Sequence, residues 1–157
     1  MVISLIFLTL ILVAGCIDTS TNNPPLPTMS TIRIPGGTID NITFTLGLAD
    51  VHDSVDMENL SIVYADAIRT ETLRPVNGSH GNPPRGYWGI VKVENEIGNP
   101  NNRLDNEERF TITINPTAPL VPRQFITIDI KPQNGRSLTI RRVAPPTILA
   151  DNILLPS

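Results

Sequence analysis

The chain has 157 residues, which suits one domain with its own core. Charged residues make up 17%, aromatic residues only 4%, and the formal net charge is −3. This composition argues against a nucleic-acid partner, which calls for a basic surface and commonly for stacking aromatics. Because there is a single cysteine, an intrachain disulfide and a metal site of clustered cysteines are both excluded within this sequence.

The N-terminus is strongly apolar. Residues 2–17 read VISLIFLTLILVAGCI and carry no charge. As a helix this run would span roughly 25 Å, which is short for a bilayer. We predict a hydrophobic helix over residues 1–17 that serves as a membrane anchor, an export signal or a segment in the core of a filament. Residues 18–28 are polar and rich in proline, which predicts an extended linker before a β domain of residues 29–157.

The end of the apolar run resembles a lipobox, the signal at which lipoproteins are cut and lipidated. Val13-Ala14-Gly15-Cys16 has the apolar-small-small-cysteine pattern, which makes Cys16 a candidate for lipidation. No Lys or Arg precedes the run, whereas export signals normally begin with a positive region. The alternative is that Cys16 is an ordinary small residue packed in a helix.

Beyond residue 29 the apolar residues alternate with polar ones, as in half-buried strands. Turn signals such as Asn77-Gly78 and Asn134-Gly135 separate the runs. The pattern predicts an all-β fold, either a sandwich or a small barrel, with antiparallel pairing. We expect the apolar tail of residues 148–155 to add an edge strand or to pack against a neighbour. The expected strands cover residues 39–46, 60–64, 87–93, 110–114, 126–130 and 138–141.

Several of these segments, in this order, resemble the archaeal flagellin (archaellin) family. Acidic residues precede the alternating strand in residues 106–114. Residues 125–146 combine FITIDIKP, Asn134-Gly135 and LTIRRVAPP, and residues 39–44 resemble a first strand. The resemblance covers roughly residues 30–157. It implies an immunoglobulin-like antiparallel β-sandwich that forms the outer wall of the archaellum filament by packing against copies of itself.

The N-terminus departs from the archaellin pattern. An archaellin has a signal that ends in a basic residue and glycine, followed by a long apolar helix with an early Glu. Here no basic residue precedes the apolar run, and the first Glu is Glu58. Two functions therefore stay open, both without enzymatic activity. The first is a self-assembling structural subunit of an archaellum-like filament in motility or adhesion.

The second is a surface lipoprotein, or an accessory archaellum protein that binds the S-layer. Both place the chain outside the archaeal cell. In both, residues 2–17 attach the chain to the membrane, either before it assembles into a filament or in place of such assembly.

Three sequons mark candidate N-glycosylation sites of a surface glycoprotein, at Asn41, Asn59 and Asn77. Asn77 is the best candidate because it lies in a segment rich in turn residues. Asn41 falls in an expected strand, where a solvent-facing side chain is still open to modification. The alternative for all three is unmodified polar surface.

An acidic segment offers oxygen ligands for a structural Ca²⁺ at Asp50, Asp53 and Asp56. Ca²⁺ takes six to eight oxygens, but the spacing does not follow the EF-hand and its glycine is missing. We therefore expect no cofactor and list these aspartates only as weak metal candidates. Neither His52 nor His80 sits in a pattern typical of a catalytic triad, so no catalytic residue is predicted.

Overall fold

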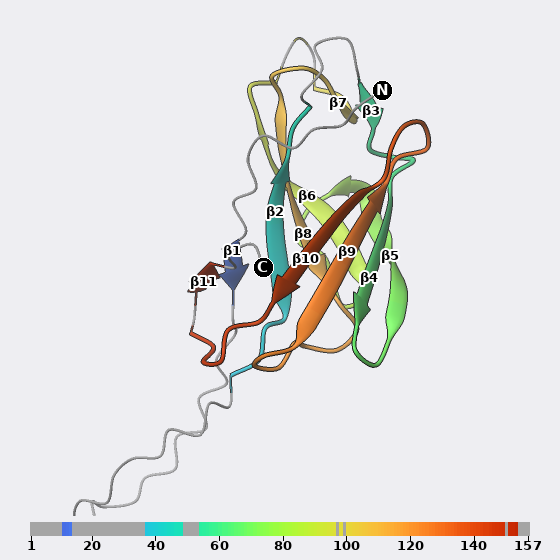
Figure 1. Ribbon diagram of the computed structural model, residues 1–157. Coiled ribbons are helices and arrows are strands. Elements are labelled where there is room, and N and C mark those ends of the chain that lie inside the picture. The colour runs from blue at the N-terminus through green and yellow to red at the C-terminus, as the bar shows by residue number, and fades with distance from the viewer. Residues whose placement is uncertain are drawn as a thin grey trace, which may run out of the picture.

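A computed structural model describes residues 11–13, 37–48, 54–96, 98, 100–149 and 151–153 of the chain. This part is entirely β structure, and it folds into two layers of strands that face each other (Figure 1). Eleven strands are present: β1 (Ile11–Val13), β2 (Asn41–Leu46), β3 (Val55–Asp56), β4 (Ser61–Asp66), β5 (Thr70–His80), β6 (Tyr87–Glu94), β7 (Arg103–Leu104), β8 (Arg109–Asn115), β9 (Phe125–Lys131), β10 (Leu138–Val143) and β11 (Asp151–Ile153).

Nine strands form one curled sheet in the order β10-β9-β4-β5-β6-β8-β2-β1-β11, and β3 pairs separately with β7. The first four strands of that order make one layer and the other five make the second. The predicted β-sandwich is therefore confirmed. All six predicted strands are present, as β2, β4, β6, β8, β9 and β10, and β5 is an additional long strand that was not predicted.

One strand pair departs from the predicted antiparallel arrangement. Strands β5 and β6 run parallel, with a register shift between Pro75 and His80. The connection between them, residues 81–86, leads the chain back toward the start of β5 so that both strands run in the same direction. Gly81 and Gly86 in this connection have positive φ angles of 118° and 80°. Two glycines in this backbone region allow a much tighter return than the helical crossover that usually joins parallel strands.

The core lies between the two layers, because alternate residues of each strand point inward. Strand β2 has every second residue buried, from Ile42 through Phe44 to Leu46, and β9 does the same with its three isoleucines. Trp88, which was expected in the core, is fully buried. Burial of each large apolar side chain contributes about 1.5–3 kcal/mol, so the interleaved Ile, Leu and Phe residues hold the layers together without a disulfide.

The N-terminal apolar run differs from the prediction where the structure describes it. Ile11–Val13 form strand β1 between β2 and β11, instead of part of a helix. A short apolar run fits a buried strand as well as a helix, and here two neighbouring strands supply hydrogen-bond partners. Residues 1–10 and 14–17 lie outside the described residues, as does the linker of residues 18–28. The predicted C-terminal edge strand is confirmed as β11.

The sandwich has two ends, which we name by their turns. At the hairpin end lie the β9–β10 turn, the start of β4 and strands β3 and β7. At the β4–β5 end lie the β4–β5 turn, the start of β9 and the end of β10, as the pairing of Ser61 with Lys131 and of Asp66 with Ile126 requires. The two ends are at the top and the bottom of Figure 1. The chain enters β2 from the β4–β5 end, where Ile39 forms a bridge with Leu120.

Candidate functional site

The three sequon asparagines occupy different surroundings. Asn77 is exposed and lies in the irregular part of β5, beside Gly78 and Ser79, which both have positive φ. Asn59 is also exposed, but its Nδ2 donates a hydrogen bond of 2.8 Å to Asp56 Oδ2. Asn41 opens β2, and its Oδ1 is buried with no hydrogen-bond partner among the described residues. The environment of Asn77 is thus the most open to a modifying enzyme.

Of the three weak metal candidates, only Asp56 lies in the described part of the chain, and Asp50 and Asp53 lie outside it. Asp56 holds the turn after β3: Oδ1 accepts a hydrogen bond of 2.9 Å from Glu58 N, and Oδ2 accepts the one from Asn59. These hydrogen bonds lower the pKa of Asp56. No cluster of three or more His, Cys, Asp or Glu side chains occurs within the described ranges.

Other residues named from the sequence are placed as follows. His52 and Cys16 lie outside the described residues, and His80 Nε2 lies 2.9 Å from Asn102 Oδ1 on the surface. Trp88 is in the core, while Tyr87 beside it is partly exposed. In the described part, no helix has the length and apolarity to cross a membrane.

The β4–β5 turn is braced by a buried network of polar side chains. The Asp66 side chain is fully buried, and its Oδ1 accepts hydrogen bonds from the backbone N–H groups of Ile68 and Arg69, at 3.0 and 3.1 Å. Its Oδ2 lies 2.7 Å from Arg69 Nη2 and accepts a hydrogen bond from the Tyr64 hydroxyl. Arg69 Nη2 also donates to Ala118 O at 3.0 Å, which ties the turn to the segment before β9.

Burial and hydrogen bonding oppose each other at this network. Burial raises the pKa of Asp66, but the hydrogen bonds from Ile68 N and from the Arg69 guanidinium outweigh it, so the pKa lies below its ordinary value. Burial, together with the neighbouring Asp66 carboxylate, raises the pKa of Tyr64. The network therefore holds an ionised Asp66 against a neutral tyrosine at neutral pH, and the turn is fixed.

The braced turn presents an apolar residue to solvent. Ile68 is 86% exposed, the highest value among the large apolar side chains described. Val121, Phe125 and Val143 lie at the same end of the sandwich, with exposures of 50%, 47% and 43%. Four large apolar side chains thus collect at the β4–β5 end. A lone turn residue such as Ile68 carries no pattern in the sequence, which is why this surface was not predicted.

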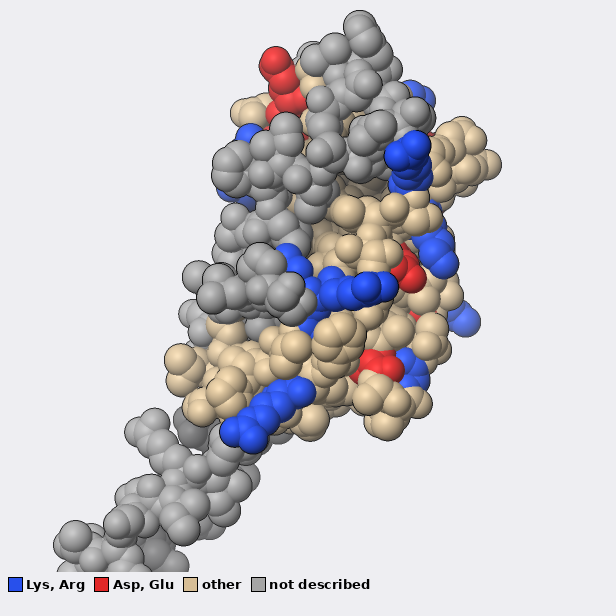
Figure 2. All heavy atoms as spheres, in the orientation of Figure 1, with Lys and Arg blue, Asp and Glu red and all other residues tan. Residues whose placement is uncertain are grey.

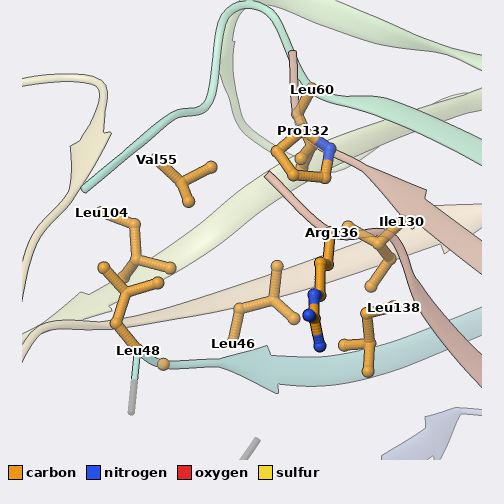
Figure 3. Close-up of a pocket in the computed structure, with 10 residues that line it drawn as sticks. Leu46, Leu48, Val55, Leu60, Leu104, Ile130, Pro132, Arg136 and Leu138 are labelled. Atoms are coloured by element: carbon orange, nitrogen blue, oxygen red, sulfur yellow. The ribbon is translucent and has the colours of Figure 1, made fainter. Parts of the chain in front are cut away.

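A small pocket opens at the hairpin end, about 20 Å³ in volume. Figure 3 shows apolar side chains converging on it from several strands, with Arg136 of the β9–β10 turn lying among them. Its lining consists of Leu46, Gly47, Leu48, Val55, Leu60, Leu104, Ile130, Pro132, Arg136 and Leu138. An apolar pocket with a single cationic side chain suits an apolar group and offers no acid-base pair for chemistry.

The face of β9 and β10 is basic. In Figure 2, Lys and Arg side chains are more prominent than Asp and Glu on this face. Exposed Arg141 lies on β10, and Lys131 and Arg136 lie at the hairpin end. Positive side chains thus gather on this face although the net charge of the chain is negative.

Comparison with solved structures identifies the fold. A crystal structure of archaeal flagellin FlaB1 from Methanocaldococcus jannaschii superposes with a TM-score of 0.58 at 11% identity, over 74% of this chain and 85% of that one. The chain has an archaellin-like fold. The archaeal flagellum of Methanospirillum hungatei matches with a TM-score of 0.52 at 15% identity, over 76% of this chain and 61% of that one.

The archaellum periplasmic stator protein FlaG from Sulfolobus acidocaldarius overlaps with a TM-score of 0.48 at 17% identity, over 65% of this chain and 85% of that one. No family model matches the sequence. No curated protein matches it either. The likeness therefore rests on the arrangement of the strands and not on shared sequence.

Proposed function

We propose that this chain is a structural subunit of an archaellum-like filament on the archaeal cell surface, without enzymatic activity. The archaellin-like fold is the observation that carries the proposal. Four exposed apolar side chains at one end of the sandwich support it, since monomeric surfaces rarely gather such residues. The subunit would assemble with copies of itself and serve motility or adhesion, with glycans on its surface asparagines.

A surface lipoprotein with an archaellin-like domain is the second candidate, favoured by the sequence Val13-Ala14-Gly15-Cys16. In that case the chain would act as an anchored monomer, or as an accessory archaellum protein that binds the S-layer. Lipid on the Cys16 thiol would then replace assembly as the means of attachment.

One experiment separates the two candidates. Filaments are sheared from the cells, and the sheared and membrane fractions are compared by electron microscopy, intact mass and N-terminal peptide mapping. A filament fraction built from this chain with an unlipidated N-terminus supports the first candidate. A mature chain that begins at Cys16 with added lipid, found only in membranes, contradicts it and supports the second.

A further inference from the structure

We propose that the β4–β5 end of one molecule docks onto the hairpin end of a second copy, with the Ile68 side chain entering the apolar pocket beneath Arg136. This contact rests on the proposed filament function and adds to it the junction between successive subunits.

The first half of the contact, the knob, is the Ile68 side chain, which the fold already holds in position. Ile68 is 86% exposed, and the backbone on which it stands is held by Asp66, Arg69 and Tyr64. Ordering a loop on binding costs free energy, which a fixed turn avoids. An exposed isoleucine on such a turn is therefore suited to anchor a contact, and the neighbouring Phe125, Val121 and Val143 widen the apolar surface around it.

The second half of the contact, the hole, is the apolar pocket at the hairpin end, with the Arg136 side chain lying across it. The pocket is lined by apolar side chains from β2, β3, β9 and β10, and Arg136 lies across it in Figure 3. Arg136 is exposed and forms no ion pair or hydrogen bond with other described residues, so it moves aside at little cost. As it stands the pocket is small, about 20 Å³, so the proposed contact requires the arginine stem to move away and leave its place to the isoleucine.

The position of the two halves selects a second copy of this chain as the occupant. Knob and hole lie at opposite ends of β4, since Leu60 lines the pocket and the turn follows Asp66. Two complementary patches at opposite ends form a head-to-tail contact, which leaves a free knob and a free hole on every dimer. Such a contact does not close on itself unless rotation forms a ring, and it otherwise propagates into a filament.

Charge restricts how the two ends can be oriented in this docking. At the β4–β5 end, exposed Arg123 stands between Val121 and Phe125 and has no acidic partner among the described residues. At the hairpin end, exposed Glu58 lies in the turn between Val55 and Leu60, and its Oε1 accepts a hydrogen bond of 2.7 Å from Asn102. The hairpin end also carries exposed Lys131 and Arg136, so the proposed orientation is the one that places Arg123 beside Glu58 and away from these two cations. Pairing of two β4–β5 ends would instead bring two Arg123 side chains together.

Cross-linking of the full chain tests the contact. Ile68→Cys and Arg136→Cys are introduced together, the chain is produced in its own cells, and surface material is oxidised and run on a non-reducing gel. We expect a ladder of covalent multimers. Each single cysteine variant is the matched control, because it retains Cys16 but lacks one half of the designed bridge. Polymer content is measured in parallel by electron microscopy.

Assembly measurements give a second, independent test. Ile68→Asp should raise the concentration needed for assembly at least about tenfold, because a charge would enter an apolar pocket. Val91→Asp is the control: Val91 is 38% exposed but lies on β6, and we expect less than a twofold change. Arg123→Glu should weaken assembly, and the additional change Glu58→Arg should restore it.

The outcomes distinguish the contact from the filament. Filaments without a ladder, and unaffected by Ile68→Asp, overturn the contact and leave the proposed function standing. A ladder that is found only in short soluble multimers supports the contact and contradicts a filament. Covalent dimers from Ile68→Cys alone that persist when Cys16 is replaced by serine mean that two β4–β5 ends meet, which overturns head-to-tail docking. The absence of both filaments and a ladder overturns both proposals.

Discussion

Gly89 shows how a single residue without a side chain is required by the fold. A Cβ built at Gly89 would lie 2.2 Å from the carbonyl oxygen of Gly81 and 3.0 Å from Val76 Cγ2. The backbone cannot yield freely, because Gly81 N donates a hydrogen bond of 3.0 Å to Ile90 O. The absence of a side chain thus permits the close return of the chain between β5 and β6.

We therefore expect Gly89→Ala to lower the free energy of unfolding by about 1–3 kcal/mol, as an overpacked site does. Chemical denaturation followed by circular dichroism measures the change. Gly47→Ala is the matched control, because its nearest contact would be an ordinary 3.7 Å to Glu108 O. Equal stability of the two variants would show that the β5–β6 connection relaxes without cost.

Asp66 links the turn at the β4–β5 end to pH. Its folded-state pKa lies below the ordinary value of 3.8, because hydrogen bonds to Ile68 N and Arg69 outweigh the effect of burial. A depressed pKa stabilises the fold above the unfolded pKa, and this stabilisation is lost as the pH falls through the folded value. The thermal stability of the native chain should thus fall more steeply below about pH 4 than that of Asp66→Asn. Thermal unfolding followed at a series of pH values measures this difference. Parallel pH profiles would contradict the assigned role of this carboxylate.

At the scale of elements, the alternating strands were predictable and β5 was not. Strands β2, β8 and β9 place isoleucine, phenylalanine or leucine at every second position, so one buried face is visible in the sequence. Strand β5 reads TETLRPVNGSH, with only two buried residues. Its proline and its Asn77-Gly78 pair are typical of turns, and pairing with neighbours on both sides overrides them.

The same limits apply to the candidate site. The sequons can be read directly from the sequence, but their relative exposure depends on strand irregularities that only the folded chain has. The apolar end and the pocket each combine residues from separate strands, such as Phe125 with Val143 and Leu46 with Leu138. No local pattern records such a meeting, because it follows from the order of strands in the sheet.

The irregular part of β5 leads to a prediction about glycosylation. Asn77 is exposed beside two residues with positive φ, whereas Asn41 has a buried Oδ1 within β2. An oligosaccharide transfer enzyme needs an accessible side-chain amide, so we expect high occupancy at Asn77 and little at Asn41. Glycopeptide mass spectrometry of protein from its own cells measures both. Asn77→Gln should remove the corresponding mass, and a dominant glycan on Asn41 would contradict the prediction.

At the scale of the whole molecule, we expect the β domain to fold without the N-terminal run. The buried apolar cluster of the described residues begins at Ile39 and continues to Ala144. It draws on both layers of the sandwich, and the contributions of its members sum to far more than a three-residue strand supplies. Folding of the domain should therefore not depend on residues 1–28, whose proposed role is attachment and assembly.

A fragment of residues 29–157 tests this separation. We expect cooperative unfolding with a Tm within about 10 °C of that of the full chain, because the fragment loses the β1 pairing with β2 and β11 but keeps the core. We also expect it to be monomeric at micromolar concentration, since one apolar end contact is weaker than that contact combined with the N-terminal segment. Scanning calorimetry and sedimentation velocity measure the two properties. A fragment that fails to fold would place the N-terminal run within the core. A fragment that polymerises unaided would assign assembly to the β domain alone.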